Sequence, residues 1–245
     1  MKPHTYSIII PAHNEEKYIG ACLEAIALAK KAVPDCRTEV IVVANRCTDQ
    51  TAMIANRFGA KVIENADKCI SKIRNAGVRA AEGEIIVTVD ADSRMTDGSL
   101  KEIGEMLESG KYIGGGTNPK FDRMSLGIFC SSMYVAYHLF PIMRKQKAML
   151  SGGMFWFYRK DFDAIGGFDE NLVSLEDMDF AIRLNRLGAG RGLKYGTLKR
   201  SRIITSSRKF DEFGDWYLIK NRTVTKRIFT GKDREAADAF YYDVR

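Results

Sequence analysis

Short apolar runs alternate with helical segments along the first part of the chain, and this rhythm restricts the possible folds most. We expect buried strands at residues 6–10, 39–43, 60–63 and 84–89. Three helices should separate them: one at 15–31, one that begins after an N-cap at 48–49, and one at 68–81. The strand runs are rich in Ile and Val, whereas the helical segments repeat apolar residues three or four positions apart. This alternation predicts an α/β fold with a parallel sheet covered by helices on both faces.

The second part of the chain is less regular. We expect helices at 97–109, 125–150 and 174–187, strands at 112–117, 155–158 and 202–205, and a charged helical stretch from residue 211. Ser174 is the expected cap of the helix at 174–187, with Glu176 and Asp177 in its first turn. Because no linker-like composition interrupts the chain, we expect a single domain over residues 1–245, with a change of character near residue 97.

Composition excludes several classes of protein. The chain has 245 residues, 38 Lys and Arg against 31 Asp and Glu, and a net charge of +7. Its five cysteines are scattered without a CxxC pair, which argues against a disulfide scaffold or a structural zinc site. Neither a signal-peptide pattern nor a clean membrane span is present, so a cytoplasmic protein is expected. The positive charge suits an anionic membrane surface or a phosphorylated small molecule; a nucleic-acid partner is not expected, because no binding motif accompanies the charge.

The sharpest local feature is Asp90-Ala91-Asp92, directly after the strand at 84–89. Two carboxylates beside a buried strand are costly unless a positive partner lies near them. A divalent cation bridging a diphosphate is one such partner, because Mg²⁺ and Mn²⁺ are often held by one or two carboxylates plus phosphate oxygens. A solvated turn or a helix cap is the alternative. Polar residues also follow two other strands, at 11–15 and 45–49, and all three strand ends are expected to meet at one crevice.

Three strings occur in order along residues 5–210: SIIIPAHNEE, RNAGVRAAEGEIIVTVDADS and IGGFDENLVSLEDMDFAIRLNRLG. Together they resemble the family 2 glycosyltransferases of GT-A fold. The resemblance implies a mostly parallel central sheet flanked by helices. It also implies inverting transfer of a sugar from a nucleotide-diphosphate donor, assisted by Mn²⁺ or Mg²⁺ at the DxD motif. The processive-synthase signature Gln-x-x-Arg-Trp is absent, which favours the addition of one sugar.

The resemblance also implies roles for individual residues. Asp177 would be the catalytic base, Asp92 the metal ligand with Asp90 beside it, and Arg208 a diphosphate-binding residue. The nucleotide would be bound by Pro11, Ala12, Asn14, Glu15, Asn45, Arg74 and Asp90. Residues 1–96 would then form the nucleotide-binding half, 97–210 the acceptor-binding half and 211–245 a C-terminal helical tail.

The acceptor side is expected around Gly152, Gly153, Trp156 and Glu176. The two glycines would let backbone approach a sugar, or would only form a turn. Trp156 would stack on a sugar ring or fill a core strand. The apolar segment 126–149 would close over an acceptor or, with the basic residues at 144–147, rest peripherally on an anionic membrane. A sugar, a lipid-linked molecule and a small molecule all remain open as acceptors.

Two departures from the family pattern affect the donor site. Many members carry Asp-Asp-Gly-Ser after the second strand, where this chain has Ala44-Asn45-Arg46-Cys47. An amide at position 45 can still match the edge of uracil or guanine, so a UDP- or GDP-linked sugar is expected. No histidine follows His138, so the late histidine that serves many GT-A enzymes as a metal ligand is missing.

Two other functions are weighed against sugar transfer. A catalytically degenerate sugar-nucleotide-binding protein would explain Asn45 and the missing late ligand, but the acids at 90, 92 and 177 argue against it. A sugar nucleotidyltransferase would open with a glycine-rich basic loop after the first strand. Here that loop is Pro-Ala-His-Asn-Glu-Glu, which is acidic and without glycine.

Overall fold

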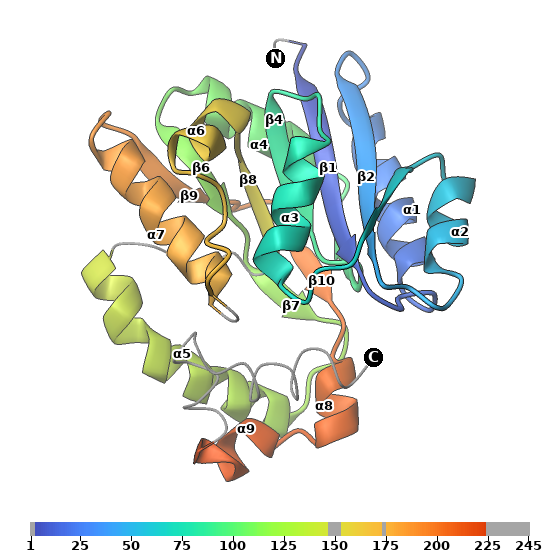
Figure 1. Cartoon of the computed structure of the whole chain (residues 1–245). Coiled ribbons are helices and arrows are strands. Elements are labelled where there is room, and N and C mark those ends of the chain that lie inside the picture. Colours follow the sequence, from blue (N-terminus) through green and yellow to red (C-terminus); the bar gives the residue numbers. More distant parts are fainter. Residues whose placement is uncertain (1–2, 147–152, 173–174, 224–245) are drawn as a thin grey trace.

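The computed structural model describes residues 3–146, 153–172 and 175–223. Within these residues, seven strands form the main sheet in the order β3-β2-β1-β4-β8-β6-β9 (Figure 1). They are β1 (Thr5–Ala12), β2 (Arg37–Asn45), β3 (Lys61–Asn65), β4 (Ile85–Val89), β6 (Tyr112–Gly116), β8 (Met154–Tyr158) and β9 (Lys194–Thr197). The first four run parallel, and only β8 is antiparallel to its neighbours β4 and β6. The mostly parallel α/β sheet expected from the sequence is thus confirmed.

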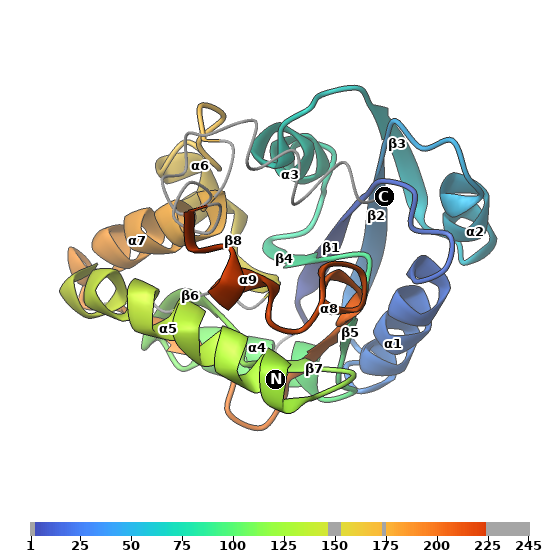
Figure 2. The ribbon, with the colours of Figure 1, turned by 90° about the horizontal axis from the view of Figure 1, so that it is seen from below.

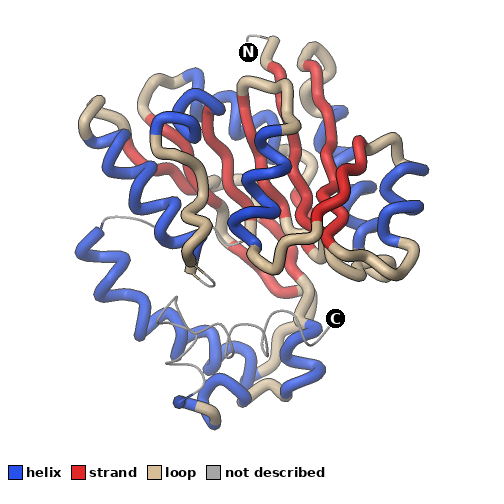
Figure 3. The backbone as a smooth tube through the Cα atoms, in the orientation of Figure 1, coloured by secondary structure: helices blue, strands red, loops and turns tan. Residues whose placement is uncertain are grey.

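Helices cover both faces of the main sheet (Figures 1 and 3). One face packs against α1 (Ile19–Lys31), α2 (Thr51–Arg57) and α4 (Ser99–Glu108). The other packs against α3 (Ile70–Arg79), α6 (Arg159–Ala164) and α7 (Glu176–Ala189). Ile8 and Ile10 of β1 belong to the first core and Ile9 to the second, as expected for a strand that is buried on both sides.

A smaller structure lies beyond the carboxyl ends of β1, β2 and β4. Its sheet contains β5 (Ser93–Met95), β10 (Ile203–Thr205) and β7 (Pro119–Phe121), in that order. Three helices accompany it: α5 (Leu126–Gln146), α8 (Arg208–Phe213) and α9 (Tyr217–Lys220). Figure 2 shows α5, α8 and α9 together on the side of the molecule that faces the viewer. Residues far apart in the sequence therefore meet at the end of the main sheet where ligands bind in such folds.

The aromatic strand β8 shows why Trp156 is a core residue. Phe155 and Phe157 join the core beside α7, whereas Trp156 points to the opposite core and is fully buried. Its indole Nε1 donates a hydrogen bond to the carbonyl oxygen of Gly116 at 2.9 Å. The ring therefore offers no free face to a sugar, and of the two roles that the sequence left open for Trp156, the structure shows the core one.

The structure also shifts several expected boundaries. The helix expected at 15–31 begins at Ile19, and the one expected at 174–187 is α7, which begins at Glu176 after Leu175. The expected cap Ser174 lies outside the described residues. Four short elements were not predicted from the sequence: β5, β7, β9 and α6. Strands of three or four residues and a helix of six have no measurable periodicity.

Among the described helices, none combines the length and the apolar character that crossing a bilayer requires.

Two helical glycines test the packing of α3 on the sheet. A methyl group added at Gly77 of α3 would lie 2.2 Å from Cγ2 of Ile9, whereas nothing lies within 4 Å of one added at Gly20 of α1. We expect Gly77→Ala to lower the free energy of unfolding by about 1–3 kcal/mol through overpacking. Gly20→Ala should raise it by about 0.5–1 kcal/mol, because alanine favours the helix and restricts the unfolded chain. Urea denaturation measures both, and an equal loss in the two variants would contradict this packing.

Candidate functional site

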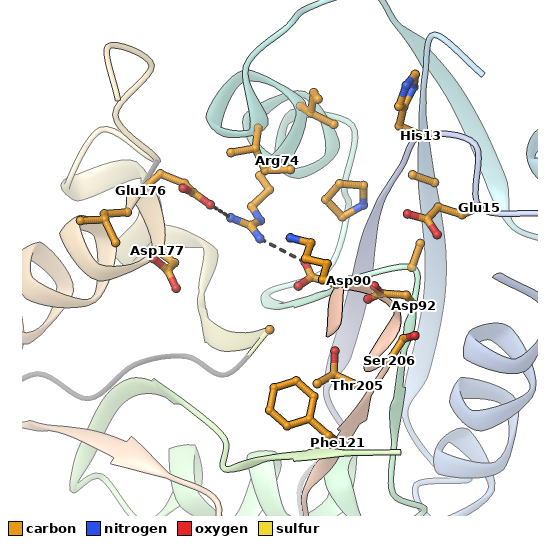
Figure 4. Close-up of a pocket in the computed structure, with 18 of the residues that line it drawn as sticks. His13, Glu15, Arg74, Asp90, Asp92, Phe121, Glu176, Asp177, Thr205 and Ser206 are labelled. Atoms are coloured by element: carbon orange, nitrogen blue, oxygen red, sulfur yellow. Dashed lines mark hydrogen bonds and ion pairs between the residues drawn. The ribbon is translucent and has the colours of Figure 1, made fainter. Parts of the chain in front are cut away.

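A cavity of about 430 Å³ lies beyond the carboxyl ends of β1, β2 and β4. Residues from all three strand ends line it, as the sequence predicted: Pro11, Ala12, Asn45, Asp90 and Asp92. Figure 4 shows Glu176 and Asp177 of α7 on one side of the cavity, with Asp92 and Glu15 on the other. The site therefore gathers acidic side chains from two distant parts of the sequence.

Asp90 and Asp92 follow β4 and lie at the floor of this cavity. Asp90 accepts a hydrogen bond from Nη2 of Arg74 at 3.1 Å, and its backbone N–H donates to the carbonyl oxygen of Gly153 at 3.2 Å. Gly153 has a φ of +82°, and a Cβ there would stand 3.1 Å from the Asp90 carboxylate. A side chain at position 153 would thus be strained and would crowd the carboxylate. The neighbouring Gly152, also predicted on the acceptor side, lies outside the described residues.

Arg74 of α3 joins the two acidic sides of the cavity. Its guanidinium is buried and forms ion pairs with Asp90 and with the carboxylate of Glu176 (Figure 4). Burial alone would lower the pKa of Arg74, but Glu176 and Asp90 raise it above its ordinary value, so the cation is permanent. Burial raises the pKa of Glu176, against the opposing attraction of Arg74. Glu176, predicted as an acceptor-side residue, thus lines the cavity as the ion-pair partner of Arg74.

Asp177 lines the cavity from the first turn of α7. Leu175 precedes this helix with a φ of +59°, an uncommon backbone conformation for a leucine. The helix N-terminus favours the negative charge of Asp177, whose Oδ1 accepts a hydrogen bond from the backbone N–H of Met178 at 2.7 Å. The structure therefore presents a carboxylate across the cavity from Asp92.

Arg208 of α8 compensates the negative charge of Glu15 and Asp92 on the side of the cavity opposite Asp177. It donates to both carboxylate oxygens of Glu15 at 2.6 and 2.7 Å and pairs with Asp92 at 2.9 Å. Its guanidinium also stands 4.8 Å from the centre of the Tyr18 ring. Burial alone would lower the pKa of Arg208, but Glu15 and Asp92 raise it. Arg208, predicted to bind diphosphate, thus lies directly beside the DxD motif.

Asn14 and Glu15 follow β1 but face different neighbours. Glu15 lines the cavity, with its carboxylate on Arg208 and its backbone N–H donating to the hydroxyl oxygen of Thr51 at 2.7 Å. Asn14 is not among the lining residues. Its Oδ1 accepts a hydrogen bond from the backbone N–H of Thr48 at 2.9 Å, so Asn14 ties the loop after β1 to the loop after β2.

Asn45 presents one defined edge. Its Nδ2 donates to the carbonyl oxygens of Asn65 and Asp67 and to Oδ1 of Asn65, at distances from 2.8 to 3.1 Å. These acceptors fix the orientation of the amide. Its Oδ1 accepts a hydrogen bond from Nε of Arg46 at 3.2 Å and retains a second lone pair. The amide nitrogen of Asn45 is therefore occupied within the protein, and its oxygen is the atom that keeps hydrogen-bonding capacity.

Several lining residues were not predicted from the sequence. His13 follows the first strand, and its Nδ1 lies 2.6 Å from the carbonyl oxygen of Asn45. Thr205, Ser206 and Lys209 arrive with β10 and α8, whose place beside the DxD motif depends on the second sheet. The cavity also has an apolar wall, formed by Phe121, Val135, Leu139, Phe210, Phe213 and Leu218. The apolar segment 126–149, expected to close over an acceptor, supplies Val135 and Leu139 of this wall.

The acids at the DxD motif fit a hard divalent cation. Asp90 and Asp92 supply carboxylate oxygens, and both already lie beside a positive guanidinium, so the position accommodates positive charge. Within the described part of the chain, no group of three or more His, Cys, Asp or Glu residues forms a closed metal site. Two carboxylates suit Mg²⁺ or Mn²⁺ when further ligands come from phosphate oxygens or water.

Comparison with known proteins agrees with this geometry. The family model Glycosyl transferase family 2 matches residues 7–166. Poly(ribitol-phosphate) beta-N-acetylglucosaminyltransferase TarS from Staphylococcus aureus is 28% identical over 195 residues, which cover 73% of this chain and 32% of TarS. The chain thus spans about a third of the length of this curated relative.

Two solved structures share the fold. Residues 1–349 of S. aureus TarS in complex with UDP-GlcNAc superpose with a TM-score of 0.61 and 19% identity, covering 98% of this chain and 71% of that one. The mannosyltransferase PcManGT from Pyrobaculum calidifontis in complex with GDP-Man and Mn²⁺ gives a TM-score of 0.64 and 16% identity, covering 100% and 72%. The family model matches more than half of the chain, and the chain therefore belongs to glycosyltransferase family 2, with the GT-A fold.

Proposed function

We propose that the protein transfers one sugar from a nucleoside-diphosphate donor to an acceptor hydroxyl, with inversion at the anomeric carbon. The observation that carries this proposal is that Asp90 and Asp92 line one side of a cavity and Asp177 lines the other (Figure 4). A single inverting displacement requires this opposition, because the base that activates the acceptor works on the face of the sugar opposite the leaving diphosphate.

The chain's own residues would divide the chemistry as follows. Asp177 takes the proton of the acceptor hydroxyl while the oxygen of that hydroxyl forms the bond to the anomeric carbon. The bond from that carbon to the diphosphate breaks, and the nucleoside diphosphate leaves with the electron pair. Arg208 and Lys209, which follow β10 beside the DxD motif, stabilise the negative charge that builds on the diphosphate. Arg74 holds Asp90 and Glu176 in place on either side.

Asp90 and Asp92 would hold the divalent cation. A bound Mn²⁺ or Mg²⁺ supplies Lewis-acid stabilisation of the leaving diphosphate. The carboxylate chemistry of the two residues supports this assignment, as does the presence of Mn²⁺ with GDP-Man in the PcManGT structure.

The donor is proposed to carry uracil or guanine. Asn45 lines the cavity, and its oxygen is the atom left to recognise a base because its amide nitrogen is occupied by Asn65 and Asp67. Uracil and guanine each present a ring N–H that this oxygen can accept, whereas cytosine presents a bare ring nitrogen. Of the two similar structures, one holds UDP-GlcNAc and the other GDP-Man, so both bases occur among donors bound to this fold.

The two halves of the chain are proposed to divide the substrates. Residues 1–96 supply Pro11, Ala12, Asn45 and the DxD motif for the nucleotide. Residues 97–210 supply the acceptor side, and the apolar wall that includes Val135 and Leu139 favours an acceptor with an apolar part. A sugar, a lipid-linked molecule and a small molecule remain the candidate acceptors. The proposed C-terminal helical tail at 211–245 is described only as far as residue 223.

Asp177→Asn tests the base. We expect the release of nucleoside diphosphate from the sugar donor to fall by about a thousandfold, because a general base contributes roughly 10²–10⁴-fold. The thermal stabilisation by UDP or GDP with Mn²⁺ should stay unchanged. Asp179→Asn is the matched control, since Asp179 lies in the same helical turn but pairs with Arg183 at 2.6 Å outside the cavity. Full activity of Asp177→Asn would show that Asp177 is not the base.

Asp92→Asn tests the metal site. A ligand that binds only the folded protein raises its melting temperature. We expect Mn²⁺ to increase the rise that UDP or GDP produces in the wild-type protein, and this increase should be lost in the variant. Asp35→Asn, at an exposed position between α1 and β2, should keep it. A metal-dependent rise of the same size in Asp92→Asn would contradict the assignment.

Base selection can be measured with the same assay. CDP should bind at least tenfold more weakly than the better of UDP and GDP, because cytosine has an unprotonated nitrogen where uracil and guanine carry the ring N–H that Asn45 would accept, and a lost hydrogen bond at a buried position costs about 1–3 kcal/mol. A dissociation constant for CDP equal to that of UDP and GDP would show that Asn45 does not select the base.

A further inference from the structure

Helix α5 carries an exposed row of large apolar side chains. Leu126, Phe129, Met133, Tyr137 and Phe140 are between 54% and 75% exposed. Their spacing of three or four residues places them along one side of the helix. Figures 1 and 2 show α5 at the periphery of the molecule, apart from the main sheet. We call these five side chains the outer row.

The opposite side of α5 is also apolar. Ile128 and Leu139 are buried, and Val135 and Leu139 line the cavity. A helix that is apolar all round is normally covered on all sides, whereas this one is covered only on its inner side. Single exposed apolar residues elsewhere, such as Phe58, need no such cover, but a continuous row marks an interaction surface.

The charges around the outer row select the kind of partner. No Asp or Glu occurs anywhere in α5, and Arg144 is exposed near its C-terminal end, five helical turns from Leu126 on the same side. Helix α9, which packs on α5, ends in the exposed Lys220, and the exposed Arg222 follows. Among the described residues, the acidic side chains paired or hydrogen-bonded with residues just before α5 lie at its start.

At that start, Asp211 and Asp215 pair with Arg123 at 2.6 and 2.8 Å, and Ser125 also donates a hydrogen bond to Asp215. Exposed Asp122 and Glu212 lie in the same region. Arg123 therefore compensates part of this acidic charge, and the positive charge on the helix itself lies at its other end, at Arg144. An apolar row with cations beside it is typical of helices that lie in the headgroup region of an anionic membrane.

We propose that the outer row of α5 docks on the surface of an anionic lipid bilayer, with the helix axis in the plane of the membrane. Tyr137 suits this position because its ring is apolar and its hydroxyl stays hydrated, and Trp216, 41% exposed beside Gly127 of α5, suits it equally. A second copy of the chain is the other possible occupant of the outer row, and the experiment below separates it from a membrane.

Docking in this way would also place the catalytic cavity. Val135 and Leu139 line it from the inner side of the helix that rests on the lipid. The cavity would then lie about one helix diameter, ~10 Å, from the membrane surface. This docking goes beyond the proposed sugar transfer and does not depend on it.

Vesicle sedimentation without nucleotide tests the docking. The wild-type protein should bind vesicles of phosphatidylcholine with phosphatidylglycerol, bind pure phosphatidylcholine more weakly, and lose binding as salt increases. Phe129→Gln and Phe140→Gln should each weaken the partition about tenfold, because roughly half a phenyl surface no longer leaves water. Arg144→Gln should weaken it about fivefold. Phe58→Gln, the matched control at an equally large exposed ring away from α5, should leave binding unchanged.

Several results would overturn the proposal. Absence of binding to the phosphatidylglycerol vesicles is one, and an equal loss in Phe58→Gln is another. A wild-type dimer in light scattering that Phe129→Gln converts to monomers, without vesicle binding, would assign the outer row to a second copy. Stabilisation of each variant by UDP or GDP shows that it is folded, and a failure of sugar transfer would leave the vesicle result standing.

Discussion

The guanidinium of Arg74 holds the two sides of the site together. It is buried between Asp90, which follows β4, and Glu176, which begins α7, residues that are far apart in the sequence. Removing one partner of such a buried pair leaves an uncompensated charge, which typically costs about 3–5 kcal/mol. The position of Asp177, the next residue in α7, relative to the DxD motif therefore depends on an electrostatic contact as well as on the packing of α7 against the sheet.

Arg208 has the corresponding role on the opposite side of the cavity. It lies at the start of α8, which follows β10 of the second sheet, and it binds Glu15 and Asp92 together. Each acid that the main sheet delivers to the cavity floor is thus paired with an arginine from a covering element. Nucleotide and cation would enter a site in which four of the five lining carboxylates already pair with arginine, so binding must replace an existing contact at Asp92. These pairs explain how so many carboxylates can share one cavity in the folded protein.

Much of this arrangement could be predicted from the sequence. The runs of Ile and Val located β1, β2 and β4, and the rule that parallel strands present their carboxyl ends together predicted the meeting of Pro11, Asn45 and Asp90. The strand β10 was expected at 202–205, but its partners β5 and β7 were not, because segments of three residues have no measurable period. Without them the approach of Arg208 to Asp92 could not be derived. Trp156 shows the limit of residue type as a guide, since an indole suits a sugar platform and a core equally well.

The apolar helix α5 was visible in the sequence, but its two different faces were not. Only the fold shows that Leu139 turns toward the cavity and Phe140 toward the outside. The amide of Asn45 is similar: the residue type supplies a donor and an acceptor, and the hydrogen bonds to Asn65 and Asp67 decide which of them remains able to bind a ligand.

A crystal structure with UDP or GDP and Mn²⁺, with the metal located by its anomalous scattering, would show whether the DxD motif and Asp177 flank the sugar. We expect the metal peak beside the carboxylates of Asp90 and Asp92, the diphosphate next to it, and the Asp177 carboxylate facing the place of the sugar. A nucleotide bound elsewhere, or a metal peak away from both aspartates while Asp92 still pairs with Arg208, would contradict this arrangement.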